Sequence, residues 1–230
     1  MAFLVQLRAV WKKRRKEDFK VPGRFITFEG GEGCGKSTQI AMLAERLRAA
    51  GIDPLVTREP GGTQLAERIR SLVREECDDP PNARAETLLF LASRAQLVAN
   101  VMRPALAAGK WVLCDRFADS TFAYQGYGRG LDLTELKALN AFATCGLVPD
   151  KTILLDVSPE VSAARMNKRQ RATNTEADRM EKAGDDFHAR LKNGFRELAA
   201  AEPGRFVVVE ADGTAEEVAD RIWNSIQHML

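Results

Sequence analysis

The chain has 230 residues, enough for one substantial domain or for a domain with a small mobile insert. Its formal net charge of +2 is too small to indicate nucleic acid or a membrane surface as the main partner. The four cysteines form no CxxC pair and only two histidines are present, so the composition argues against a zinc site. No apolar run reaches the roughly 18 residues of a spanning helix and no secretory signal is evident, so we expect a cytoplasmic protein with reduced thiols.

The first 22 residues have a composition of their own. An apolar stretch from Met1 to Val10 is followed by the basic run Lys12 to Lys16, and this charge order is the reverse of a secretory signal. We expect a flexible basic extension, residues 1–22, ahead of a domain that spans residues 23–230. The alternative is an arm that weakly contacts a membrane or RNA.

Beyond this extension the sequence alternates short apolar runs with helical patterns. The helical patterns lie at residues 40–50, 85–102, 133–144 and 214–229, with Asp132 and the pair Thr214 and Glu217 as expected caps. The expected strands are Phe25–Phe28, Pro54–Val56, Trp111–Cys114, Thr152–Leu155 and Phe206–Val209. Strands separated by helices indicate parallel βαβ units, so the predicted fold class is α/β, with a five-stranded parallel sheet flanked by helices in three layers.

The stretch FEGGEGCGKST contains the pattern GxxxxGK[ST] between a predicted strand and a predicted helix. Its glycines let backbone N–H groups surround phosphate oxygens, and the N-terminus of the helix adds a positive end. Lys36 is expected to reach the β- and γ-phosphates and Ser37 to ligate Mg²⁺. The pattern therefore predicts an ATP site made of Gly30, Gly31, Glu32, Gly33, Cys34, Gly35, Lys36, Ser37 and Thr38.

Other positions indicate what is done with the nucleotide. The tetrapeptide NKRQ at 167–170 departs from the guanine-binding pattern NKxD at its fourth position, and no Asp is followed three residues later by Gly. This argues against a GTPase and favours a phosphotransferase. Asp115 follows the strand-like WVLC, where a carboxylate helps to hold Mg²⁺; the alternative is a plain ion pair between Asp115 and Arg116.

Six motifs follow one another along the chain: FEGGEGCGKST, TREPGGTQLAERIRSL, LLFLASRAQLV, DRFADSTFAYQGYGRG, LLDVSPE and DRME. In this order, from about Phe25 to the C-terminus, the sequence resembles the bacterial thymidylate kinases. Other nucleoside monophosphate kinases share the phosphate loop, but not REPGGT together with DRF and AYQG. The resemblance implies a P-loop kinase fold with a short mobile lid.

The resemblance also implies roles for individual side chains. Glu32 would face the acceptor nucleotide near its sugar 3′-hydroxyl, whereas the alternative is a solvated Glu. Phe90 would stack on thymine and Arg94 would hydrogen-bond the carbonyl at position 4, although periodicity alone predicts a core Phe and a surface Arg. Arg116 would bind the acceptor phosphate and Tyr124 would crowd the sugar 2′ position. The remaining acceptor-site residues are Arg58, Pro60, Ser120, Thr121 and Gln125.

Residues 165–182 carry several arginines and little apolar periodicity, which is typical of a solvated linker. The resemblance implies instead a lid whose arginines stabilise the moving phosphoryl group, because the phosphate loop itself contains no Arg. Arg165, Arg169 and Arg171 are the candidates, with Arg169 and Arg171 ranked equally. Asp178 and Arg179 match the DR pair that closes the lid in the family.

The resemblance implies an enzyme that transfers the γ-phosphate of MgATP to dTMP, giving ADP and dTDP in dTTP synthesis. Mg²⁺ is the expected cofactor, ATP and dTMP are the expected substrates and a homodimer is the expected assembly, without nucleic acid or stable membrane association. The alternatives are a kinase for another acceptor, such as dUMP, and a P-loop module that binds nucleotide without transferring phosphate. The expected catalytic residues are Lys36, Arg116, Glu32, Arg169 and Arg171, and the expected metal ligands are Ser37 and Asp115.

Overall fold

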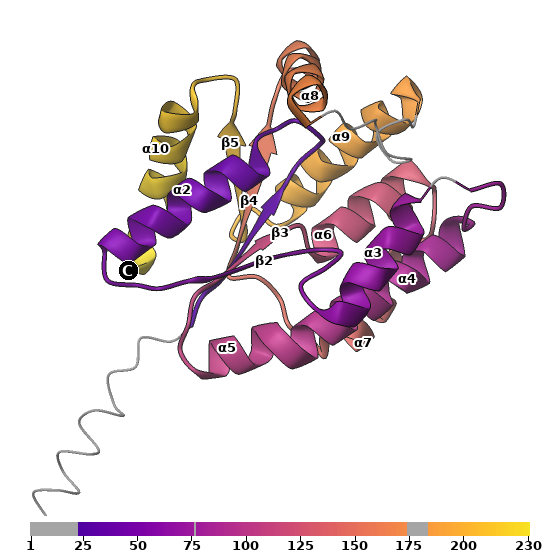
Figure 1. The fold of residues 1–230 in the computed structure, drawn as a ribbon, viewed down its shortest axis with the longest axis horizontal. Helices are drawn as coiled ribbons and strands as arrows, with labels where there is room; N and C mark the ends of the chain where they lie inside the picture. Colours follow the sequence, from indigo (N-terminus) through magenta and orange to yellow (C-terminus); the bar gives the residue numbers. More distant parts are fainter. Residues whose placement is uncertain (1–22, 76, 174–183) are drawn as a thin grey trace, which may run out of the picture.

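The computed structural model of the protein describes residues 23–75, 77–173 and 184–230. Within these residues, five parallel strands form one sheet in the order β2-β3-β1-β4-β5 (Figure 1). The five predicted strands are confirmed, although the second begins one residue later than expected and continues for two residues beyond Val56. The strands are β1 (Phe25–Glu29), β2 (Leu55–Arg58), β3 (Val112–Asp115), β4 (Lys151–Asp156) and β5 (Phe206–Glu210).

Helices cover both faces of this sheet, as the α/β prediction requires. One face packs against α2 (Lys36–Ala49) and α10 (Ala215–Ile226) (Figure 1). The other face is covered by α4 (Ala83–Leu97), which continues into the π-helical segment η1 (Val98–Met102), and by α9 (Asp185–Ala201). The other helices of the described residues are α3 (Gln64–Arg74), α5 (Arg103–Ala107), α6 (Ala118–Thr121), η2 (Phe122–Gly128), α7 (Leu133–Thr144), α8 (Pro159–Thr173) and η3 (Gln227–Met229).

Local signals set where several helices begin. The Asp132 side chain accepts a hydrogen bond from the N–H of Glu135 (2.9 Å) at the start of α7, as predicted. Thr214 and Glu217 form the predicted capping box at the start of α10. Helix α2 begins four residues earlier than its apolar periodicity indicates, because Gly35 ends the phosphate loop in a left-handed conformation (φ +98°) directly before it.

The arginine-rich segment that was expected as a lid begins inside a helix. Residues 165–173 form the C-terminal part of α8, so this part is helical rather than an irregular linker. The remainder of that segment, with Asp178 and Arg179, and the N-terminal extension 1–22 lie outside the described residues. Among the helices that the structure describes, none is long and apolar enough to cross a bilayer.

The register of the sheet brings functional segments to one edge. The Cα atom of Asp115 at the end of β3 is paired with that of Arg58 in β2 and with that of Phe28 in β1. Because the three strands are parallel, the segments that follow them leave the sheet at the same edge. The phosphate loop after β1 therefore lies beside the REPGGT segment after β2 and the DRF segment after β3.

Candidate active site

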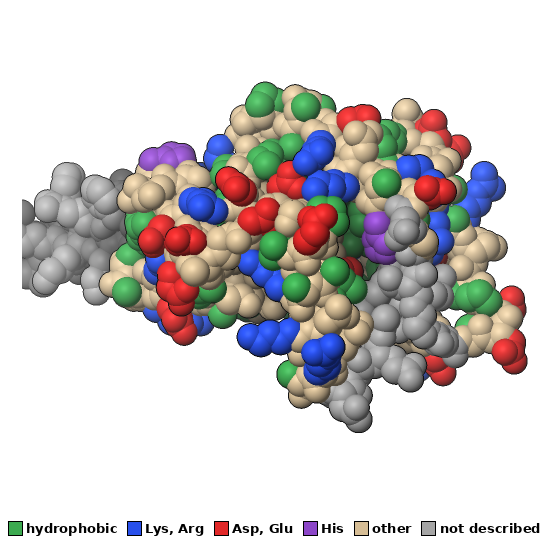
Figure 2. Space-filling view, turned by 90° about the horizontal axis from the view of Figure 1, so that it is seen from above, with side chains coloured by type: hydrophobic (Ala, Val, Ile, Leu, Met, Phe, Trp, Pro, Cys, Tyr) green, Lys and Arg blue, Asp and Glu red, His purple; other side chains and the backbone are tan. Residues whose placement is uncertain are grey.

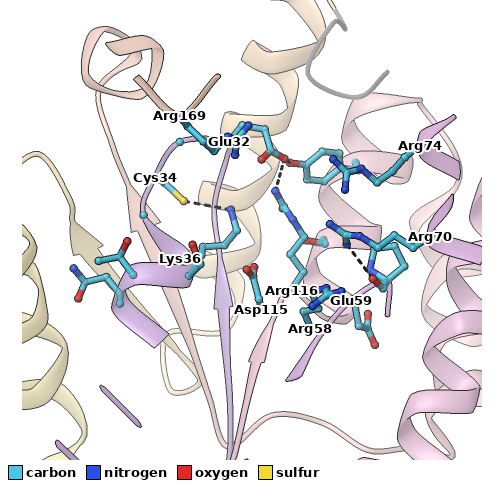
Figure 3. Close-up of a pocket in the computed structure, with 18 of the residues that line it drawn as sticks. Glu32, Cys34, Lys36, Arg58, Glu59, Arg70, Arg74, Asp115, Arg116 and Arg169 are labelled. Carbon is cyan, nitrogen blue, oxygen red and sulfur yellow. Dashed lines mark hydrogen bonds and ion pairs between the residues drawn. The ribbon is translucent and has the colours of Figure 1, made fainter. Parts of the chain in front are cut away.

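A cleft of about 880 Å³ lies beyond the carboxyl ends of β1, β2 and β3 (Figure 3). Its lining comes from the loop after β1, from α3 and α4, from the segment after β3 and from α8. On the face seen from above, acidic and basic side chains are interspersed with apolar ones (Figure 2). The cleft lies where open α/β sheets bind their ligands, beyond the carboxyl ends of their strands.

The phosphate loop holds the Lys36 ammonium group in place. Gly30 has φ +135°, and a Cβ there would lie 2.6 Å from the carbonyl oxygen of Leu155, so a side chain at this position would force the loop to shift. Lys36 is buried, and its Nζ donates to the carbonyl oxygens of Gly30 (3.1 Å) and Gly31 (2.8 Å) and to the Sγ of Cys34 (3.4 Å). The ammonium group thus lies where the amides of such a loop bind phosphate oxygens.

Glu32 points from the same loop toward the residues that follow β3 (Figure 3). Its Oε1 accepts hydrogen bonds from Arg116 Nη2 (2.5 Å) and from the Tyr124 hydroxyl (3.2 Å). Burial alone would raise the pKa of Glu32, but the charges of Arg116 and Lys36 and the Tyr124 hydrogen bond outweigh it and lower the pKa to about 2. Glu32 is therefore an ion-paired carboxylate rather than a solvated one.

Arg116 connects this carboxylate to the phosphate loop. Its Nη1 donates to the carbonyl oxygen of Gly30 (3.2 Å), and its guanidinium carbon lies 5.0 Å from the centre of the Tyr124 ring. Within the described residues its salt bridge is to Glu32 rather than to the neighbouring Asp115. Lys36 and Arg116 therefore donate to the same backbone oxygen, that of Gly30, from two sides of the cleft.

Arg94 lines the cleft but is only 2% exposed, where periodicity alone indicated a surface charge. Its Nε and Nη2 donate to Glu59 Oε2 (2.8 and 2.6 Å), and Nη2 also donates to the carbonyl oxygen of Phe117 (2.9 Å). Its Nη1 donates to Thr121 Oγ1 (2.8 Å) and to Asn140 Oδ1. All five N–H donors of the guanidinium group thus have protein acceptors, so a hydrogen bond to a thymine carbonyl, which stays a prediction, needs a shared donor.

The other acceptor-site predictions converge on the same cleft. Phe90 is half-buried in its lining, four residues before Arg94 on α4, and Gln125 is buried with its Nε2 donating to Glu86 Oε1 (3.0 Å). All nine residues that the resemblance assigned to the acceptor line this one cleft, although they come from three separate segments of the chain. Their roles toward a nucleotide remain predictions. The nine are Arg58, Pro60, Phe90, Arg94, Arg116, Ser120, Thr121, Tyr124 and Gln125.

Comparison with known proteins identifies the family to which this cleft belongs. A family model described as thymidylate kinase matches residues 28–222. A thymidylate kinase from Synechococcus sp. is 52% identical over 206 residues, which cover 90% of this chain and 95% of that relative. One from Solidesulfovibrio magneticus is 49% identical over 208 residues, which cover 90% and 100% of the two chains. The chain belongs to the thymidylate kinase family.

A solved structure supports the same assignment. The crystal structure of thymidylate kinase from Ehrlichia chaffeensis superimposes with a TM-score of 0.72 at 32% sequence identity, covering 90% of this chain and 100% of that one. The predicted P-loop kinase fold is thereby confirmed. As a thymidylate kinase, the protein is an ATP-dependent nucleoside monophosphate kinase that phosphorylates dTMP to dTDP.

Two groups in the thymidylate kinase cleft suit Mg²⁺. Asp115 Oδ1 is buried and has no hydrogen-bond partner among the described residues, and the exposed Ser37 also lines the cleft. In the described part of the chain, no group of three His, Cys, Asp or Glu side chains could hold a metal on its own. A site with one carboxylate and one hydroxyl suits Mg²⁺, which takes most of its ligands from water and from the substrate phosphates.

The candidate lid arginines differ in position, although the sequence ranks two of them equally. Arg165 donates to the carbonyl oxygens of Cys34 (Nη1, 3.5 Å) and Gly213 (Nη2, 3.1 Å), so it connects α8 to the phosphate loop. Arg169 lines the cleft and contributes to the low pKa of Glu32. Arg171 is not among the described residues that line the cleft.

Sequence reasoning missed two arginines of α3. Arg70 donates through Nη1 to the carbonyl oxygen of Pro60 (3.0 Å), and both it and Arg74 line the cleft (Figure 3). Burial, followed by the positive charges of Arg74 and Arg58, lowers the pKa of Arg70. Such a gathering of like charges is typical of a site for anions. The available signal was the four-residue spacing of Arg70 and Arg74, which puts both on one face of the helix.

Proposed function

We propose that MgATP binds on the phosphate loop, that dTMP binds between α3, α4 and the segment after β3, and that the γ-phosphate passes directly from one to the other. The observation that carries this proposal is the meeting of Lys36 and Arg116 at the carbonyl oxygen of Gly30. A donor phosphate held by Lys36 and an acceptor phosphate held by Arg116 would then be neighbours. The acceptor phosphate oxygen is itself a nucleophile, so no covalent enzyme intermediate is needed.

Charge neutralisation and alignment supply the catalysis in this proposal. Seven arginines and Lys36 line the cleft against three carboxylates, those of Glu32, Glu59 and Asp115. Such an excess of positive charge complements substrates whose phosphate groups each carry up to about two negative charges near pH 7. Electrostatic stabilisation by these side chains would be greatest where negative charge is most concentrated, namely at the two phosphates between which transfer occurs.

Ser37 and Asp115 would hold Mg²⁺ together with the ATP phosphates. When bound, the ion supplies electrostatic stabilisation of the β- and γ-phosphate oxygens. The buried, unpartnered Asp115 Oδ1 supports this role because it offers an acceptor for a metal ligand or for a metal-bound water. Lys36 would stabilise the same oxygens from the loop side.

The acceptor would be held at three points. Arg116, Arg58 and Arg70 would bind the dTMP phosphate, with Arg70 as the addition that the structure suggests. Phe90 would stack on thymine, and one N–H donor of Arg94 would be shared with the thymine carbonyl oxygen. The residues that would face the base are Ser120, Thr121 and Gln125. Glu32 would exchange its contact with Arg116 for one with the sugar when the dTMP phosphate arrives, and Tyr124 would exclude a ribose 2′-hydroxyl.

Arg165 and Arg169 would act from α8 on the transferred phosphoryl group. Arg169 is better placed for this role than Arg171, because Arg169 lines the cleft and lies close enough to Glu32 to lower the pKa of that carboxylate. Exclusion of water by these side chains would prevent hydrolysis of ATP in place of transfer.

We also propose a homodimer in the cytoplasm, formed through α3, α4 and α7. These neighbouring helices expose large apolar side chains, namely Leu65, Leu72, Leu88, Leu139 and Phe142, and Phe142 is 86% exposed. Exposed apolar side chains gathered on adjacent helices are typical of protein interfaces. Replacing Leu88 and Phe142 by Glu should give a monomer in light scattering, whereas an unchanged mass would contradict this interface.

An ADP-release assay with MgATP and a panel of dTMP, dUMP, UMP, dCMP and AMP tests the proposed function. We expect strong preference for dTMP, with dUMP weaker by roughly 10- to 200-fold, because one methyl group in an apolar pocket gives about 1–3 kcal/mol of discrimination. Preference for another acceptor would keep the kinase and reject the thymine pocket. Nucleotide binding without transfer to any acceptor would instead favour a non-catalytic binding module.

A further inference from the structure

We propose that Glu29, the last residue of β1, is a positioning residue that holds Arg116 in place for the acceptor phosphate. Glu29 touches no substrate in this proposal and acts only through Arg116. The inference rests on the proposed phosphate-binding role of Arg116. The KM for dTMP of Arg116→Ala tests that role separately, because an unchanged value would refute the role of Arg116 itself rather than that of Glu29.

Arg116 has a backbone that needs support. Its φ is +68°, in the left-handed region, which residues with a Cβ seldom adopt. Its own N–H donates to the carbonyl oxygen of Phe28 (3.0 Å) and its carbonyl oxygen accepts from Cys114 Sγ (3.1 Å), which leaves the N–H of the next residue to be held. The next residue, Phe117, carries the chain away from the sheet, so whatever holds the N–H of Phe117 also sets the direction of the Arg116 side chain.

Glu29 provides that support by two routes. Its Oε1 accepts hydrogen bonds from the backbone N–H groups of Phe117 (2.8 Å) and Ser120 (3.3 Å). Its Oε2 accepts a hydrogen bond from the Ser120 hydroxyl (2.6 Å), whose oxygen in turn accepts one from Arg116 Nη1 (3.3 Å). One carboxylate therefore holds both the backbone after Arg116 and the guanidinium group itself.

The surroundings of Glu29 make this support sensitive to pH. The side chain is fully buried, and the charged groups that face it are Asp119 on α6 and Arg116. Burial, followed by the negative charge of Asp119, raises the pKa of Glu29 to about 7, and the attraction of Arg116 offsets this only in part. A protonated carboxyl has one fewer oxygen free to accept from the three N–H and O–H donors, so the hold on Arg116 weakens below neutral pH.

The substitution Glu29→Gln tests the proposal because glutamine has the same shape and no charge. We expect KM for dTMP to rise about tenfold or more, the size of effect seen when supporting contacts of a binding side chain are lost, while KM for ATP changes by less than about twofold. Thr27→Val is the matched control: Thr27 is fully buried in the same strand and contacts Thr152 Oγ1 (3.0 Å) rather than the Arg116 turn. This variant should lose stability without changing either KM.

The pH dependence separates positioning from a merely structural role. The ratio of KM for dTMP between Glu29→Gln and the unmodified enzyme should be largest above pH 7 and should approach one as the pH falls to about 6, because protonated Glu resembles Gln. Protonation of dTMP itself cancels in this ratio. A ratio independent of pH, or equal increases in KM for both substrates, would overturn the proposal. If Glu29→Gln fails to fold, Glu29→Asp keeps the charge but withdraws the carboxylate from the Arg116 turn, and an unchanged KM for dTMP in that variant would likewise overturn the proposal.

Discussion

The two halves of the cleft are built in different ways. The donor half is one continuous segment, in which the backbone of the phosphate loop and Lys36 lie within a few residues of each other. The acceptor half is built from side chains of α3, α4, η2 and the segment after β3, joined by buried ion pairs such as Arg94 with Glu59. A polyphosphate needs repeated N–H donors and one cation, which a single loop can supply. A base, a sugar and a phosphate need contacts from several directions, which a single loop cannot.

This difference predicts that damage to the two halves has different signatures. A change in the donor half should reduce the rate of transfer and leave the fold and the affinity for dTMP nearly intact. A change in the acceptor half should alter dTMP use and stability together, because its side chains also hold one another in place.

The largest effect is expected for Lys36→Ala. We expect kcat to fall by about a thousandfold or more, because one preorganised cation at the transferred phosphate is lost. KM for dTMP should change by less than about threefold, which steady-state kinetics can measure. Substantial residual turnover would contradict the role of the phosphate loop.

Arg94→Ala should reduce both the use of dTMP and the stability of the fold. We expect kcat/KM for dTMP to fall about a hundredfold with little change in ATP affinity, since the base loses its hydrogen-bonding partner. Unfolding free energy should fall by about 3–5 kcal/mol, because Glu59 is left as a buried charge without its cation.

The double variant Arg94→Ala with Glu59→Gln sharpens this test. Removing the stranded charge should recover much of the stability measured by denaturant unfolding, but not the use of dTMP. If Arg94→Ala weakened ATP and dTMP equally, the assignment of Arg94 to the acceptor half would be wrong.

Comparison of Arg169→Ala with Arg171→Ala tests which side chain of α8 reaches the transferred phosphate. Arg169 lines the cleft and Arg171 does not, so we expect kcat to fall about a hundredfold for the first variant and less than about threefold for the second. Arg171 thus serves as the matched control, two residues away on the same helix. A larger loss for Arg171→Ala would reverse the assignment.

The smallest effect concerns pH and stability. The pKa of Glu29 is about 7 against its usual 4.5, so between these values the folded state binds more protons than the unfolded state and this group lowers stability as the pH rises. The pKa of Glu32 is about 2, so its stabilising contribution is present above about pH 4.5 and is lost as the pH falls toward 2.

Denaturant unfolding of Glu29→Gln between pH 5 and 8 measures the first effect. As the pH rises over this range, we expect the unfolding free energy to fall less in the variant than in the unmodified protein. An identical slope for both proteins would mean that Glu29 keeps its charge throughout.

The same contrast explains what sequence reasoning could predict. The phosphate loop, the five strands and the caps at Asp132 and Thr214 depend on residues close together in the chain, and the structure confirms these elements. The start of α2 was misjudged because apolar periodicity says nothing about polar residues in the first turn, where Gly35 ends the loop. The helical state of residues 165–173 was missed for a related reason, since α8 is polar on most of its surface.

The acceptor half shows the limit more clearly. The family motifs assigned four residues to one acceptor site, namely Phe90, Arg94, Tyr124 and Gln125. They did not reveal that the N–H donors of Arg94 are already used by Glu59, Thr121 and Asn140. These contacts join residues 27 to 46 positions apart, and no local spacing encodes them. Glu29 directly follows the predicted strand Phe25–Phe28, but its three hydrogen bonds to the segment after β3 appear only once the parallel register is known.

We propose above that the donor phosphate held by Lys36 and the acceptor phosphate held by Arg116 are neighbours, because both side chains donate to the carbonyl oxygen of Gly30. The most direct measurement is the affinity, by titration calorimetry, of a compound in which adenosine and thymidine are joined through their 5′ positions by a polyphosphate chain that spans both sites. If the sites adjoin, this compound should bind about a hundredfold more tightly than either ATP or dTMP alone, because binding of one end raises the effective concentration of the other. An affinity no higher than that of the better single nucleotide would show that the two halves of the cleft do not form one transfer site.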